Sequence, residues 1–320
     1  MRLSLAGWLV AVTLGTAVRA EVTVQEYAIP EGHGIHDVWA PGQPGEPVWF
    51  SAQGSGELGI LDPQSGAVRF VSLGRGTAPH GVIGGPDGAA WLTDGGQNAI
   101  ARVDPRTRAV RVWKLPPRAS FANLNTATFG DGGILWFTGQ SGIYGRLDPK
   151  SGAMQVFDAP RGVGPYGIHS TPRGVVYFAS LAGSYIARID GASGAATVLE
   201  PPTPRQGARR VWSDSRGDLW VSEWNSGNLS RYSPASGRWS TWRAPGEAPR
   251  LYAVYVDDSD KVWASEWSAQ VMLRFDSQAE KFETFRSSSR RANVRQIHGR
   301  RGEVWTPESA ADKLVVYRYR

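Results

Sequence analysis

One segment, PHGVIGGPDGAAWLTDGG (residues 79–96), has a histidine and an aspartate at a spacing that brings them together. A hairpin that turns at the Gly-Pro-Asp-Gly stretch puts His80 opposite Thr93 and makes Asp94 its diagonal neighbour. Histidine is the side chain that changes charge near neutral pH, so this pair is a candidate for acid–base chemistry. Because His80 begins its strand, we expect its side chain to be partly exposed.

The same pattern recurs seven times along the chain at a nearly constant interval. Each unit carries one large aromatic anchor, and the anchors lie 41 to 45 residues apart: Trp49, Trp91, Trp136, Tyr177, Trp220, Trp263 and Trp305. Turns such as DPQSG, DPRTR and DPKSG recur with the same period. The 39 glycines and 14 tryptophans favour short strands over helices. A period of about 40 to 45 residues with strand content is typical of β-propeller blades.

The two ends of the chain predict how the ring closes. The last unit ends with one strand after its anchor hairpin, KLVVYRYR, and has no fourth strand. Residues 21–30, EVTVQEYAIP, resemble the fourth strands of other units, such as AVRVWKLPP. We therefore predict an all-β fold, a seven-bladed propeller of four-stranded blades in one domain, residues 21–320. In this fold the mature N-terminal strand completes the last blade and removes an exposed edge. We also expect the protein to be a monomer.

The N-terminal 20 residues have the pattern of a secretory signal. Arg2 precedes an apolar stretch, and Val18 and Ala20 are small residues at the expected cleavage positions. The sequence thus predicts a periplasmic or secreted protein, and no later segment is long enough to span a bilayer. Cysteine is absent, so no disulfides support the fold. Basic residues are scattered rather than clustered, which argues against a nucleic-acid partner.

The first strand of each blade lines the central channel of a propeller. The position eleven residues before each anchor should form a ring at one rim of this channel: His80, Asn125, Tyr166, Arg209, Tyr252 and Val294. In the first unit a longer turn places His36 in this ring with a two-residue insertion. The position three residues after the anchor adds carboxylates to this rim: Asp94, Glu223, Glu266 and Glu308. Polar groups that converge in a concavity predict a ligand site, so we expect a small molecule to bind at the rim.

A structural interpretation of the same residues remains open. Channels are hydrated, so polar side chains there need no function, and the carboxylates have Arg209, Arg210 and Arg295 as possible partners. Trp224 and Trp267 are either stacking surfaces for a ligand or blade packing. Two further histidines, His169 and His298, lie deeper along their strands and are interpreted as structural.

Three segments resemble units of the streptogramin B lyase (virginiamycin B lyase) family. They are PHGVIGGPDGAAWLTDGGQNAIARVDP, YGRLDPKSGAMQVFDAP and LWVSEWNSGNLSRYSP, and the resemblance spans all seven units. It implies a seven-bladed propeller and a carbon–oxygen lyase that opens a cyclic depsipeptide by elimination across its ester linkage, with Mg²⁺.

The resemblance also implies roles for individual residues. The family's general base falls on His80, its substrate-contacting histidine on His36, and one metal-binding carboxylate on Asp94. The second metal carboxylate of the family has no counterpart, since that position is Ala78. A carboxylate-held Mg²⁺ would stabilise the enolate that forms when the base removes a proton from carbon.

Three functions follow from these observations. The first is a Mg²⁺-assisted lyase acting on an ester or lactone, with His80 as base, Asp94 as metal ligand, and a substrate contacted by a set of rim residues: His36, Asn125, Tyr166, Arg209, Glu223, Tyr252 and Glu266. The alternative is a non-enzymatic periplasmic propeller that binds a ligand or protein through Trp224, Glu223 and Glu266. A hydrolytic lactonase is the third, with Asn125 and Asp94 in a calcium site.

Overall fold

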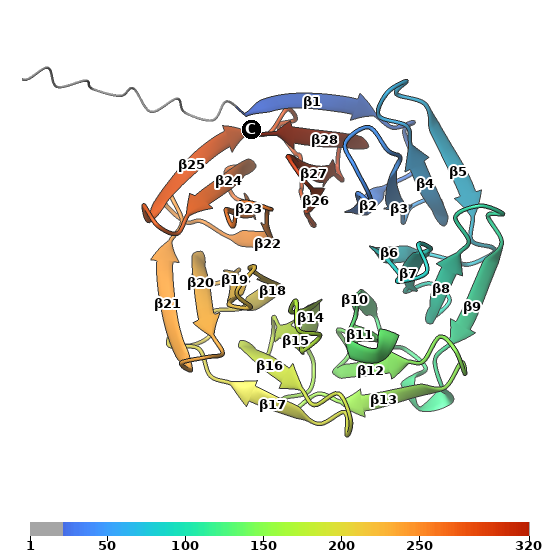
Figure 1. Cartoon of the computed structure of the whole chain (residues 1–320), viewed down its shortest axis with the longest axis horizontal. Coiled ribbons are helices and arrows are strands. Elements are labelled where there is room, and N and C mark those ends of the chain that lie inside the picture. Colours follow the sequence, from blue (N-terminus) through green and yellow to red (C-terminus); the bar gives the residue numbers. More distant parts are fainter. Residues whose placement is uncertain (1–21, 320) are drawn as a thin grey trace, which may run out of the picture.

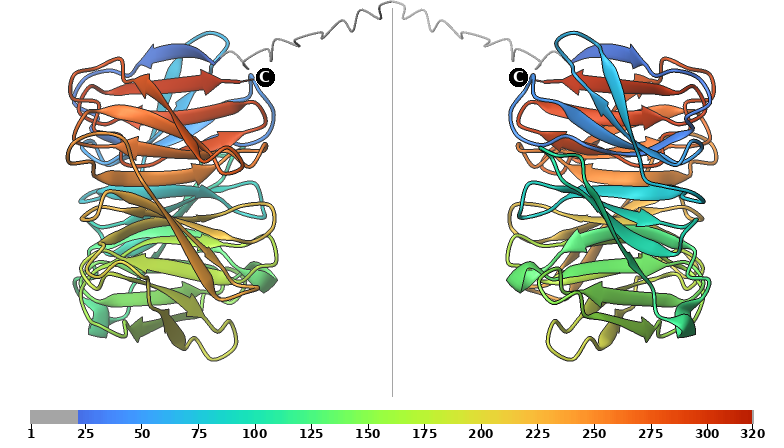
Figure 2. Two further views of the ribbon diagram at one scale, coloured as in Figure 1. Left: turned by 90° about the vertical axis from the view of Figure 1, so that its left-hand side faces the viewer. Right: turned by 90° about the vertical axis from the view of Figure 1, so that its right-hand side faces the viewer.

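A computed structural model of the protein describes residues 22–319, and within them the chain forms a ring of seven antiparallel sheets (Figure 1). Seen from the side, the ring is a thick disc with the strands stacked across it (Figure 2). Each sheet has four strands, and the only helices in this range are two short 3₁₀ turns, Pro117–Ala119 and Asp131–Gly133. The predicted seven-bladed all-β propeller is therefore confirmed.

Each blade runs outward from the channel in chain order. Blades 1 to 3 consist of β2 (Ile35–Trp39), β3 (Val48–Ala52), β4 (Glu57–Leu61) and β5 (Val68–Ser72); β6 (Pro79–Gly84), β7 (Ala90–Asp94), β8 (Ala99–Val103) and β9 (Val110–Lys114); and β10 (Leu124–Phe129), β11 (Leu135–Gly139), β12 (Ile143–Leu147) and β13 (Met154–Asp158). Blades 4 to 6 consist of β14 (Pro165–Ser170), β15 (Val176–Ser180), β16 (Tyr185–Ile189) and β17 (Ala196–Leu199); β18 (Ala208–Ser213), β19 (Leu219–Glu223), β20 (Asn228–Ser233) and β21 (Arg238–Arg243); and β22 (Leu251–Val256), β23 (Val262–Glu266), β24 (Val271–Asp276) and β25 (Lys281–Arg286).

Blade 7 joins the two ends of the chain. It consists of β26 (His298–Arg300), β27 (Glu303–Glu308), β28 (Lys313–Arg318) and β1 (Thr23–Ala28), and β1 pairs with β28 along all six of its residues. The closure predicted from the sequence is confirmed. The signal peptide predicted for residues 1–20 lies outside the described residues. Between residues 22 and 319, no helix has the length and apolar character needed to cross a membrane.

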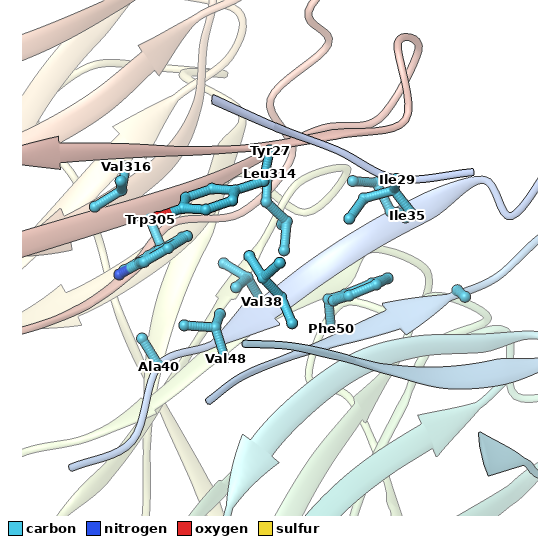
Figure 3. Packing of buried hydrophobic residues seen from close by; sticks show 12 residues of the cluster. Tyr27, Ile29, Ile35, Val38, Ala40, Val48, Phe50, Trp305, Leu314 and Val316 are labelled. Carbon is cyan, nitrogen blue, oxygen red and sulfur yellow. The ribbon is translucent and has the colours of Figure 1, made fainter. Parts of the chain in front are cut away.

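The anchors are buried between neighbouring blades, which explains their spacing. Trp91, Trp220, Trp263 and Trp305 are each at most 2% exposed, and their indole N–H groups donate to nearby carboxylates. For example, Trp263 Nε1 donates to Asp257 Oδ2 at 2.8 Å, so the turn before the strand is tied to the anchor within it. At the closure, Tyr27 stacks on Trp305 with a ring separation of 5.5 Å (Figure 3).

A β-bulge interrupts the inner strand of every blade except blade 7. In β2, for example, the register shifts between Ile35 and Val38. Adjacent side chains of a regular strand point to opposite faces, whereas a bulge redirects one of them. The bulges therefore let two successive residues of an inner strand face the same region of the channel.

Candidate active site at the centre of the propeller

The residues of the predicted ring do meet at the start of the inner strands, with one correction. In blade 4, His169 pairs with the anchor Tyr177. The ring residue of this blade, Tyr166, lies three residues before His169. In blade 7 the equivalent pair is His298 and Trp305, and these two residues are one position closer together in the sequence than His169 and Tyr177. Counting three residues back from His298 gives Arg295. Val294, expected in the ring, instead packs in the apolar core because the last inner hairpin is one residue shorter.

Two histidines of neighbouring blades contact each other within this ring of residues. The imidazole centroids of His36 and His80 are 3.9 Å apart, and both side chains are buried. The bulge in β2 brings Asp37 alongside, so that ligand atoms of His36, Asp37 and His80 all lie within 4.8 Å of one another. The expectation that His80 is partly exposed is wrong: it is 7% exposed, because the side chains of the ring pack against each other and close the channel at this level.

The hydrogen bonds give the two histidines different states. Asp37 Oδ1 lies 2.8 Å from His36 Nδ1, so His36 donates through Nδ1 and keeps its lone pair on Nε2. His80 has its Nε2 3.4 Å from the amide nitrogen of Asn125, and its buried Nδ1 has no partner among the described residues. Only His36 thus has a carboxylate that fixes its tautomer, which is the arrangement that prepares an imidazole to act as a base.

The environment keeps both imidazoles neutral. Burial lowers the pKa of His36 well below its usual value, and the charges of Arg210, Arg295 and Arg209 lower it further. Burial and the neighbouring His36 lower the pKa of His80 in the same direction. Neutral rings at pH 7 have a lone pair available for a proton.

Arginines, rather than carboxylates, dominate the charge of the channel centre. Arg210 Nη2 lies 3.4 Å from Asp37 Oδ1, which makes Asp37 the shared partner of an arginine and a histidine. Burial raises the pKa of Asp37, while Arg210 acts in the opposite direction. Arg209 and Arg295, in the ring above, have no carboxylate partner within 4 Å in residues 22–319. The centre is therefore electropositive.

The aromatic ring residues are brought together with Arg209. Its guanidinium lies 3.4 Å from the ring centroid of Tyr252 and donates to the Tyr166 hydroxyl at 3.0 Å. The two tyrosine hydroxyls are 2.5 Å apart. Trp267 stacks on Tyr252, with 5.0 Å between ring centroids. Four predicted contact residues, Asn125, Tyr166, Arg209 and Tyr252, thus belong to the same layer as the histidines.

The predicted carboxylates lie at the rim but face their own turns. Asp94 Oδ1 accepts backbone N–H groups of Ala78, Gly96 and Gln97 at 2.9 to 3.1 Å. Glu266 likewise accepts backbone N–H groups from its own turn and from Arg250.

The other two rim carboxylates are occupied in the same way. Glu223 accepts from Ser226 and Ser230, and Glu308 accepts from Ser288. These four groups organise turns, and the structure does not bring them to the histidine pair.

The roles of three contributors to this centre were not predicted from the sequence. Asp37 was not named, and Arg210 was named only as a possible partner of the rim carboxylates; a regular strand would point both away from the channel, and the bulges reverse this. Arg295 was likewise named only as a possible carboxylate partner, because the residue count in the last blade was off by one and placed Val294 in the ring. A further repeated feature is a hydroxyl two residues after the anchor: Ser51 donates to the His80 carbonyl at 2.6 Å and accepts the Asp37 N–H at 2.9 Å. Its recurrence as Thr93, Thr138, Ser222 and Ser265 is the signal that identifies it.

Comparison with known proteins places the chain in a family. The sequence model of the virginiamycin B lyase family matches residues 6–272. The chain belongs to the virginiamycin B lyase family. Comparison with the curated proteins gives no match.

Solved structures of virginiamycin B lyases have the same fold. The selenomethionine-substituted virginiamycin B lyase from Staphylococcus aureus aligns with a TM-score of 0.84 and 20% identity over 93% of this chain and 99% of the other. A streptogramin B lyase structure aligns equally well, over 98% of that chain. So does a catalytically inactive variant of the S. aureus enzyme with quinupristin, again with a TM-score of 0.84 and 20% identity over 93% of this chain and 99% of the other.

The residues to which the sequence resemblance assigns the metal do not fit Mg²⁺ in this chain. Mg²⁺ requires oxygen ligands in near-octahedral geometry. Ala78 offers no side-chain oxygen, and Asp94 already uses one carboxylate oxygen for three backbone N–H groups. The cluster in residues 22–319 whose ligand atoms do converge, His36–Asp37–His80, supplies two nitrogens and lies beside Arg210. No step of the reaction is therefore assigned to a metal ion.

The mismatch predicts weak Mg²⁺ binding that one substitution should strengthen. We expect no resolvable heat when the unmodified protein is titrated with Mg²⁺, and measurable binding by Ala78→Glu, because the new carboxylate adds the missing oxygen ligands beside Asp94. Ala78→Gln is the matched control, since it has the same length without the charge. Tight binding by the unmodified protein would mean that its metal ligands are other residues.

Proposed function

We propose that this protein is a carbon–oxygen lyase that opens an ester or lactone linkage of a cyclic depsipeptide or related small molecule by elimination. The observation that carries the proposal is the pairing of His36 with Asp37 beside His80 at the propeller centre, with the Nδ1–Oδ1 distance of 2.8 Å. Membership of the virginiamycin B lyase family supports the proposed reaction class. We further propose that the protein is exported to the periplasm or secreted and acts as a monomer.

His36 is the better supported base of the two histidines. Its Nδ1–H is held by Asp37, so Nε2 accepts a proton from the carbon next to the one that bears the ester oxygen, on the alcohol side of the linkage, and Asp37 stabilises the imidazolium that results. The electron pair left by that proton forms the new C=C bond, the C–O bond breaks, and the carboxylate leaves. His80, which the family resemblance implies as base, is placed to contact the substrate from the neighbouring blade.

The guanidinium groups supply the positive charge that stabilises the developing negative charge, as a metal ion does in related chemistry. Negative charge develops on the carbonyl oxygen and on the departing carboxylate, and fixed positive groups in a water-poor site stabilise it strongly. Arg210 and Arg295 lie close enough to lower the pKa of both histidines, in each case alongside the effect of burial. Trp224 and Trp267 provide flat surfaces around Arg209 and Tyr252 for the body of the substrate.

The products distinguish this proposal from hydrolysis. Incubation with a cyclic depsipeptide in heavy-oxygen water should give a linear product with a new ultraviolet-absorbing C=C bond and no heavy oxygen. Added chelator should leave the rate unchanged, since the chain's own cations stabilise the charge. Heavy oxygen in the released carboxylate would indicate a hydrolase and contradict elimination.

A second candidate is a propeller that binds a ligand without converting it. The observation that favours it is the burial of the ring: His36, His80, Asn125, Tyr166 and Tyr252 are all at most 7% exposed. A substrate must displace some of these contacts to reach His36. Binding of the intact depsipeptide without any product would support this second function.

A further inference from the structure

A separate cavity lies below the histidine layer, toward the face where the inner hairpins turn. Its volume is about 220 Å³, and it continues past His169 and Trp212 into a wider hollow of about 420 Å³ on that face. The residues that line it sit one to four positions further along the inner strands than the histidine ring. The cavity is thus reached from the side opposite to the rim discussed above.

The walls of the cavity suit a flat apolar body. Trp39, Ile83, Phe129 and Trp212 contribute to the lining. His169 lies against Trp212 with 3.9 Å between ring centroids and an angle of 24° between the planes. An apolar cavity of about 150 Å³ is large enough to bind benzene, so this one holds a single substituted ring.

The polar groups in the lining are mostly hydrogen-bond donors. His298 Nδ1 accepts the N–H of Ala40, so the neutral ring carries its proton on Nε2. Gln296 Oε1 accepts the N–H of Val38 at 2.9 Å, which orients the amide NH₂ of Gln296 as a donor. Arg210 Nε is buried and has no partner among residues 22–319.

The acceptors near the cavity are already in use. Asp37, the only carboxylate in the lining, accepts from His36 and Arg210. At the mouth, Asp214 and Asp257 accept from tryptophan indoles, and Asp260 accepts from Ser215. A ligand that satisfies the free donors must itself bring acceptor oxygens.

We propose that this cavity binds a small aromatic carboxylic acid, with its ring between Trp39 and Trp212 and its carboxylate toward Gln296, His298 and Arg210. The ligand would lie outside the proposed contacts of the lyase substrate, although the cavity shares the lining residues Asp37 and Arg210 with the lyase centre. His169 and His298, interpreted from the sequence as structural, are lining residues of this site.

Benzoate is the probe, followed by titration calorimetry and by tryptophan fluorescence. We expect saturable binding of benzoate, with benzyl alcohol and acetate at least about tenfold weaker because one lacks the acid and the other the ring. Gln296→Glu keeps the acceptor for Val38 but sets a carboxylate against the ligand, so it should abolish benzoate binding and spare that of benzyl alcohol. Trp212→Leu should weaken both, whereas Trp239→Leu, on the outer strand β21, should change neither.

Three results would overturn the proposal. They are an absence of benzoate binding to the unmodified protein, equal affinity for benzoate and benzyl alcohol, and unchanged benzoate affinity in Gln296→Glu. A loss of benzoate binding in Arg295→Gln together with its retention in Gln296→Glu would place the anion at the opposite rim and equally contradict this site.

Discussion

A chain that begins at Glu31 is expected to unfold at least about 10 °C below a chain that begins at Val22. The shorter chain lacks β1, which pairs with β28 from Thr23↔Arg318 to Ala28↔Lys313. It also loses Tyr27 and Ile29, which are 7% and 4% exposed, and burial of such side chains stabilises by about 1.5–3 kcal/mol each. That sum is a large fraction of the usual stability of a domain.

The truncation removes more than two side chains. Leu314, Val316 and Trp305 pack against the segment and would become exposed (Figure 3). Strand β28 would become an unpaired edge, so the shorter chain should also aggregate more readily. The chain from Val22 is the matched control, because it lacks residues 1–21 and retains all of β1. Equal melting temperatures by differential scanning calorimetry would show that β1 is not part of the cooperative ring.

Replacement of His36 by glutamine is expected to lower the turnover of a cyclic depsipeptide by about 10²–10⁴-fold. Glutamine fills most of the imidazole volume and can hydrogen-bond, but it cannot take up the proton. Because His36 is buried, we compare glutamine rather than alanine variants, and a melting curve of each variant separates loss of chemistry from loss of fold. Asp37→Asn should also slow turnover, since an amide holds the wrong tautomer of His36.

The neighbouring histidines provide the comparison. His80→Gln should weaken substrate binding and reduce turnover less than His36→Gln does. His33→Gln is the control, because His33 lies in the loop before β2 and stacks on Phe70 away from the pair. Full turnover in His36→Gln with none in His80→Gln would assign the base to His80, as the family resemblance implies.

The repeat carries most of what the sequence predicts correctly about the fold. Anchors such as Trp91 and Trp263 are buried and recur at a nearly constant interval, because each blade needs a large side chain to fill the interface with its neighbour. The resemblance of residues 21–30 to a fourth strand identifies the closure, because only the last repeat unit lacks a fourth strand of its own. Five of the seven ring residues follow from the same count, because their inner hairpins keep a constant register from the anchor, and His36 follows once the longer turn of its hairpin is included.

The tertiary structure alone decides the chemistry of the centre. Asp37 meets His36 only because a bulge breaks strand alternation, and Arg210 reaches Asp37 from blade 5, four blades along the ring. The carboxylate of Asp94 is diagonal to His80 in sequence register, yet it turns toward the backbone of Gly96 and Gln97. The physical reason is that strand patterning fixes which residues reach the channel, whereas charge balance and hydrogen-bond partners come from blades distant in sequence. The sequence determined a ring with histidines at its centre, and the packing of the seven blades made that centre arginine-rich.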